Sequence, residues 1–295
     1  MLREYEQDSK LEHFSRLSAP ALLLFMLKDS QLEAEKKKEL VSRIILPKLV
    51  PYKNSSDWMK RYNLLSCFQY YIDARYYSVL TKLIRDYIPI IRINACQIGS
   101  EIADEQIYQA ILDVLLHSDH ASRTLYIDNF QANKEIWPFL LKQLEQTENT
   151  LLKKIIYDIL LRTGCDASFF PVAREDSLSA GRNVRLAVIR LLPYTDHKEV
   201  LPTLKIILED SEWRVRNAAV QALAALKKTS VIPLIAEKLQ DKEWWVRVSA
   251  AKVLAQSGNK GLQMLEAHKE LLPEKTGDYA AYFLEIAEIR RELHA

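Results

Sequence analysis

The stretch Asp210–Ala219, with the sequence DSEWRVRNAA, returns 31 residues later as Asp241–Ala250, with the sequence DKEWWVRVSA. The second arginine of the first stretch belongs to a longer series, in which a basic residue recurs every 31 positions without a gap or shift. Its seven members are Arg61, Arg92, Arg123, Lys154, Arg185, Arg216 and Arg247. Self-similarity at a fixed period indicates that the chain consists of one small structural unit copied repeatedly.

Each unit has the pattern of two helices joined by a short turn. After Val200, Pro202 falls in the first turn of a helix, where its missing N–H and fixed φ are tolerated. Asp210 can then cap the next helix by accepting from its free N–H groups. Residues three and seven positions after the basic series are almost all apolar or small, as a buried helix face requires. They are Leu64, Ala95, Tyr126, Tyr157, Val188, Ala219 and Ala250, and then Phe68, Gly99, Phe130, Leu161, Leu192, Leu223 and Leu254.

These landmarks predict seven repeats over residues 45–261, which begin near positions 45, 76, 107, 138, 169, 200 and 231. Less regular helices are expected at both ends, over residues 1–44 and as a pair over residues 262–295. Terminal units of a repeat array cover the core on one side and face water on the other, so their sequences diverge. We therefore expect a single solenoid domain over residues 1–295.

The stretch Asp210–Ala219 and its copy at Asp241–Ala250 resemble the HEAT-repeat signature, and are most similar to the short-repeat variety first noted in phycobilisome lyases. The resemblance is strongest over residues 169–258. It implies an all-α fold, a right-handed α-solenoid of stacked antiparallel helix pairs, with the second helices on the concave side. The family includes scaffolds, adaptors, bilin lyases, a metal-dependent hydroxylase and base-excision glycosylases, so the resemblance alone does not decide the function.

The basic series allows two interpretations, a groove that grips phosphates or a structural ladder. Six positions before each basic residue stand Ser55, Asp86, His117, Glu148, Ser179, Asp210 and Asp241. Because carboxylates are retained where the arginine motif is best retained, we favour ion pairs with the cap carboxylate of the same or the next unit. Replacing Arg216 with Ala should then lower the melting temperature, since stranding a partly buried charge costs on the order of 3 kcal/mol.

Tryptophan occurs three positions before the basic residue at Trp58, Trp213 and Trp244, and the register predicts that these side chains lie in the core. Trp245 has no counterpart in the other repeats. It is either an exposed anchor or a residue packed against the C-terminal helix pair.

Positions one, five and eight after each basic residue form a helix face that is not needed for packing against the neighbouring helices. This face is polar with apolar interruptions and is more basic in its C-terminal half. The candidate partner-binding residues on the concave side are Arg162, Arg190, Arg214, Gln221, Trp245 and Lys252. A mixed apolar and arginine surface fits a protein or peptide partner better than DNA, which favours denser positive charge. An ordinary solvated helix face is the competing interpretation.

The composition excludes several classes. A net charge of +2 argues against a general attraction to nucleic acid or anionic membranes. Cys67, Cys96 and Cys165 are far apart and form no CxxC pair, which argues against a disulfide framework or a thiolate zinc site and fits a reducing, cytoplasmic setting. The start of the chain has no signal-peptide pattern, and no apolar stretch is long enough to span a membrane. The chain could still be the soluble part of a longer, membrane-anchored protein.

The common catalytic and nucleotide-binding motifs are missing from the sequence. His117 and His120 flank Asp119, but we interpret them as surface histidines and expect neither a metal nor a cofactor. We therefore expect a non-enzymatic scaffold or adaptor that binds a protein partner on its concave face. The alternative is a HEAT-type enzyme or nucleic-acid binder, similar to the alkylated-base DNA glycosylases or the bilin lyases.

Overall fold

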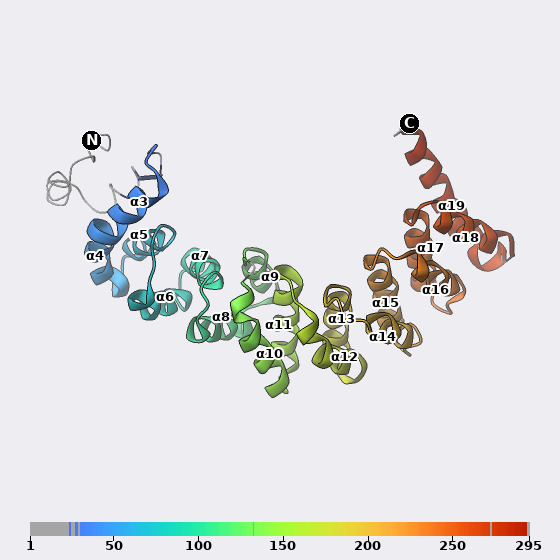
Figure 1. Cartoon of the computed structure of the whole chain (residues 1–295), viewed down its shortest axis with the longest axis horizontal. Coiled ribbons are helices and arrows are strands. Elements are labelled where there is room, and N and C mark those ends of the chain that lie inside the picture. The colour runs from blue at the N-terminus through green and yellow to red at the C-terminus, as the bar shows by residue number, and fades with distance from the viewer. Residues whose placement is uncertain (1–23, 25–26, 29, 132, 272, 294–295) are drawn as a thin grey trace. The chain divides into compact units, whose positions relative to one another are not determined.

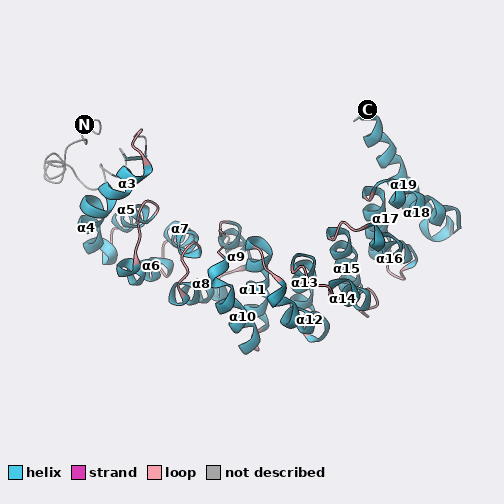
Figure 2. Cartoon of the chain, viewed as in Figure 1, coloured by secondary structure: helices cyan, strands magenta, loops and turns pink. Residues whose placement is uncertain are grey.

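The computed structural model describes residues 24, 27–28, 30–131, 133–271 and 273–293. These residues form helices and connecting turns, and none of them lies in a β-strand (Figure 2). The prediction of an all-α solenoid fold is confirmed. The chain packs as two compact units, Met1–Ile136 and Trp137–Ala295.

The first unit contains helix pairs that stack in two layers. Helix α3 (Ala34–Leu40) continues through a π-helical turn, Val41–Ile45, into the short α4 (Leu46–Leu49). The remaining helices are α5 (Trp58–Phe68), α6 (Tyr77–Ile84), α7 (Pro89–Ser100), α8 (Glu105–His117) and α9 (His120–Asp128). Helices α5, α7 and α9 pack in sequence to form one layer, and α6 packs against α8 in the other (Figure 1).

The second unit repeats this arrangement. Its helices are α10 (Trp137–Gln146), α11 (Thr150–Thr163), α12 (Phe170–Ser179), α13 (Arg182–Leu191), α14 (Val200–Ile207), α15 (Trp213–Ala225), α16 (Ile232–Glu237), α17 (Trp244–Gln256), α18 (Gly258–Leu271) and α19 (Pro273–Leu293). The second helices of the repeats, α11, α13, α15 and α17, pack side by side in that order. Proline stands in the first turn of α12 and α16, where a missing N–H costs nothing.

The core lies between the two layers and follows the repeat. All seven residues three positions after the basic series are buried. The column seven positions after it is also buried, except that Leu161 is 38% exposed and the prediction for this residue is wrong. Its neighbour Leu160 is fully buried, as Leu191 is at the same repeat position of α13.

None of the described helices combines the length and the apolar character that crossing a membrane requires.

Candidate functional site

The basic residues form an arginine ladder, which we define as the seven basic positions together with Asp86, Asp210 and Asp241. Nε and Nη2 of Arg216 each lie 2.7 Å from a carboxylate oxygen of Asp241. Arg61 holds Asp86 in the same way, at 2.6 and 2.9 Å. Arg185 also bonds the carboxylate of Asp210. In every case the carboxylate lies 25 residues after the arginine, so each ion pair links one repeat to the next.

The ladder also fixes the turn between the two helices in the repeats of Arg61, Arg92, Arg216 and Arg247. Nη1 of Arg216 donates to the carbonyl oxygen of Asp210 at 2.8 Å, six residues earlier in the chain. Arg247 makes the same contact to Asp241 at 2.9 Å. The Asp241 carboxylate in turn accepts from the N–H of Glu243 at 2.9 Å. The carboxylates of Asp86, Asp210 and Asp241 therefore neutralise their arginine partners within the chain.

The pairing of Arg216 and Asp241 has an electrostatic consequence. Both side chains are only 5% exposed. The hydrogen bond to Asp241 raises the pKa of Arg216 above its ordinary value. Burial alone would raise the pKa of Asp241, but the bonds from Arg216 and from the Glu243 N–H outweigh it, so this pKa lies below its ordinary value. Both groups are therefore charged in the folded chain at neutral pH.

The ladder changes partners where the repeat is less regular. Lys154 bonds Asp158 on its own helix. The link to the next helix pair comes from Lys153, whose Nζ lies 2.7 Å from a carboxylate oxygen of Asp176. The Tyr157 hydroxyl donates to the same carboxylate at 2.6 Å. In this repeat the link to the next helix pair therefore uses the basic residue that precedes the one in the series.

The six candidate partner-binding residues are all exposed. Arg190, Gln221 and Lys252 occupy the same repeat position on α13, α15 and α17, which pack side by side. Gln221 donates to the Ser249 hydroxyl on α17, so it belongs partly to the contact between helices. Arg162 lies near the end of α11, one helix further along the layer.

Two further candidates lie at the beginnings of helices. Arg214 is the second residue of α15, and its guanidinium carbon lies 4.5 Å from the centre of the Trp213 ring. Trp245 is the second residue of α17 and is 56% exposed. It is therefore not packed into the core.

The prediction that the repeated tryptophans lie in the core is wrong. Trp58 is 42% exposed and Trp244 is 47% exposed, while Trp213 is half-buried. Each is the first residue of its helix. In α17, Val248 and Lys252 follow Trp244 four and eight positions later on the same side of the helix, and Lys252 is exposed. That spacing could have placed Trp244 on the surface, but not Trp58, since Ser66 at the same distance from Trp58 is buried.

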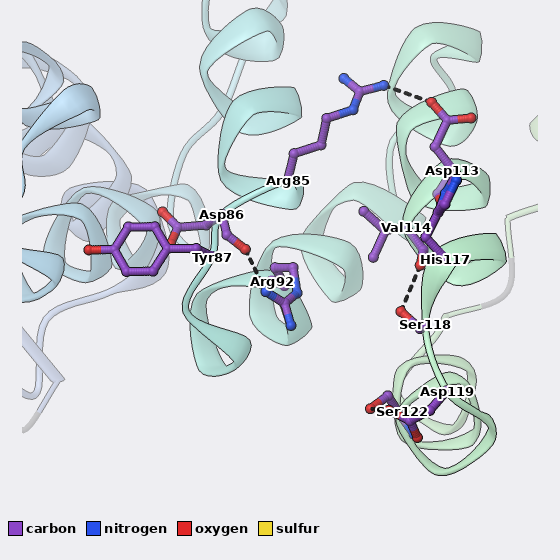
Figure 3. A pocket seen from close by; sticks show the side chains of 10 residues that line it. All are labelled: Arg85, Asp86, Tyr87, Arg92, Asp113, Val114, His117, Ser118, Asp119 and Ser122. Carbon is purple, nitrogen blue, oxygen red and sulfur yellow. Dashed lines mark hydrogen bonds and ion pairs between the residues drawn. The ribbon is translucent and has the colours of Figure 1, made fainter.

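A separate pocket of about 560 Å³ lies in the first unit, where α6 and α7 meet α8 and α9 (Figure 3). Arg85 and Asp113 form an ion pair of 2.9 Å at its edge. Arg92 lines the pocket from α7, and His117 lines it from the end of α8. In the part of the chain that the structure describes, no group of three or more His, Cys, Asp or Glu side chains could hold a metal ion.

Comparison with known proteins agrees with the geometry of the second unit. A family model of HEAT repeats matches residues 172–255 and 204–270. Residues 172–270 are HEAT repeats. A search of curated protein sequences gives no match.

Solved structures of low identity are also similar to this chain, including the following three. Human deoxyhypusine hydroxylase in complex with glycerol is 14% identical, with a TM-score of 0.33, over 85% of this chain and 99% of that one. The Escherichia coli protein YibA is 13% identical, with a TM-score of 0.40, over 88% and 98%. An engineered protein is 16% identical, with a TM-score of 0.26, over 92% and 97%. Similarity at this level says nothing about the function of this chain.

Proposed function

We propose that the chain is a non-enzymatic scaffold or adaptor that binds a polypeptide partner on the layer formed by α13, α15 and α17. The observation that carries this proposal is the exposed pair of Trp244 and Trp245 on α17. Their ring centres are 4.6 Å apart, with the rings at 78°. Large exposed aromatic side chains that hold each other rigidly are favourable anchors for a protein interface.

The charges around this pair support the same proposal. Among the described residues, Arg190 and Lys252 form no ion pair, in contrast to the buried arginines of the ladder. Arg214 lies 3.6 Å from the Glu212 carboxylate and remains exposed. Arginine beside tryptophan is typical of the energetically important part of an interface. The partner would therefore present apolar side chains next to carboxylates.

A site-specific photo-cross-linker tests this proposal. We would place p-benzoylphenylalanine at position 245, express the variant in cells of the source organism and irradiate them. The matched control carries the cross-linker at Ile206, which is 55% exposed on α14 in the other layer. A discrete adduct is expected from position 245 and none from position 206.

Charge reversal then tests the cation contribution. The double variant Arg190→Glu with Lys252→Glu should lose the adduct and keep the melting temperature within a few degrees, because both side chains are exposed. An adduct that forms only from position 206, or one that keeps its full yield in the charge-reversed variant, would refute the proposed surface.

A further inference from the structure

The arginine ladder lacks its carboxylate at Arg92. Asp86 and Asp241 stand 25 residues after Arg61 and Arg216, but His117 stands 25 residues after Arg92. Among the described residues, Arg92 has two acceptors, the Asp86 carbonyl oxygen at 2.8 Å and the Tyr126 hydroxyl at 3.1 Å. A guanidinium has five N–H donors, so three remain without a protein acceptor. Arg92 lines the pocket of Figure 3.

The carboxylates that line this pocket are already engaged. Asp86 is held by Arg61, and Asp113 by Arg85. The Asp119 carboxylate caps α9 by accepting from the N–H of Ser122 at 2.9 Å and from its hydroxyl at 2.7 Å. Asp119 stands at the repeat position of Asp57, Glu212 and Glu243, directly before the second helix. It caps the helix there, but it forms no ion pair with Arg92.

We propose that this pocket binds a carboxylate group from another molecule, in the role that the aspartate of the next repeat has beside Arg61 and Arg216. Nε of Arg92 already donates to the Tyr126 hydroxyl, so the carboxylate would accept two parallel N–H bonds from Nη1 and Nη2, whereas Arg61 and Arg216 bind theirs through Nε and Nη2. The nearby Asp113 and Asp119 disfavour a phosphate dianion, because its additional charge increases the repulsion. The carboxylate could belong to a small organic acid or to an acidic side chain of a polypeptide.

Nuclear magnetic resonance of the 295-residue chain tests this proposal. The backbone amides of Ser118 and Ser122, which line the pocket, would be followed during titration at constant ionic strength. The probes are glutarate, a hexaglutamate peptide with blocked ends, and inorganic phosphate. Both carboxylate probes should shift these amides, and phosphate should bind at least several-fold more weakly. Peptide binding at least tenfold tighter than glutarate identifies a polypeptide source, and equal or weaker binding identifies a free acid.

Two variants locate the site by different routes. Arg92→Gln removes the charge and should weaken glutarate binding at least tenfold. His117→Asp supplies an internal carboxylate at the ladder position, so it should weaken glutarate binding to a similar extent and raise the melting temperature. Arg174→Gln, an exposed arginine of α12 in the second unit, is the control and should leave binding unchanged. The proposal is overturned if neither carboxylate shifts the amides, or if His117→Asp binds glutarate as the wild type does.

Discussion

At the scale of single residues, the Arg216–Asp241 pair couples folding to pH. The pKa of Asp241 is below its ordinary value in the folded chain, so the unfolded chain binds a proton more readily at this group. The pair therefore contributes its full stabilisation above the unfolded pKa of about 3.9, and this contribution is lost as the pH falls from that value through the lower pKa of the folded chain.

This linkage gives a prediction for Asp241→Asn. The variant should melt at a lower temperature than the wild type at neutral pH, because it leaves Arg216 without its charged partner. The difference should shrink as the pH falls below about 5, where the wild-type carboxylate becomes protonated in the unfolded chain. Thermal melts of both proteins between roughly pH 3 and 7 measure it. A difference that stays constant over this range would contradict the assignment.

The sequence predicted part of this residue chemistry. The 31-residue period placed the arginines, and the preceding cap column placed Asp210 and Asp241. Whether an arginine contacts its own cap or the next one depends on how the repeats stack, and the period does not contain that information. In the structure Arg216 contacts both cap residues: it donates to the carbonyl oxygen of Asp210 in its own repeat and to the carboxylate of Asp241 in the next repeat.

At the scale of elements, a repeat pattern predicts the buried side of a helix better than its single residues. The apolar columns correctly indicated which side of each second helix is buried. They did not predict that Leu161 is exposed, nor that Lys153 and not Lys154 links α11 to the next helix pair.

A second limit is the treatment of the first residue of a helix. Trp58 and Trp244 follow the same 31-residue spacing as the buried columns. Each of them, however, begins its helix and precedes the helical turn that packs into the core. The buried residue of that turn in α17 is Val246, which is fully inaccessible. The candidate surface therefore includes tryptophans that the repeat pattern had assigned to the core.

The close approach of α17 and α18 depends on a glycine. A Cβ at Gly261 would lie 2.1 Å from the Leu254 carbonyl oxygen, which is backbone and cannot rotate away. Gly261→Ala should lower the free energy of unfolding by about 1–3 kcal/mol, because the overpacking outweighs the gain in helix propensity of about 1 kcal/mol. Urea denaturation measures this change.

Gly181→Ala is the control for that variant. A Cβ there would meet no atom within 4 Å, and the residue lies at the exposed start of α13. Its free energy of unfolding should change by less than about 0.5 kcal/mol. A Gly261→Ala protein as stable as the control would show that the two helices can separate at little cost.

At the scale of the whole molecule, the residues that stabilise the repeats differ from those that we propose bind the partner. Buried ion pairs connect consecutive repeats inside each unit, as Arg61–Asp86 does in the first and Arg216–Asp241 in the second. The exposed cations and tryptophans of α13, α15 and α17 contribute little to this connection. The surface can therefore vary with the partner while the helix stack remains the same.

The measurement that tests this account most directly is a double-mutant cycle on Arg216→Ala and Asp241→Ala, with free energies of unfolding from urea denaturation. A buried, hydrogen-bonded pair between repeats should give a coupling free energy of at least about 2 kcal/mol. The same cycle on Arg92→Ala and His117→Ala, where the ladder lacks its carboxylate, should give less than about 0.5 kcal/mol. A coupling at Arg216 and Asp241 no larger than at Arg92 and His117 would contradict the claim that the ladder holds the repeats together.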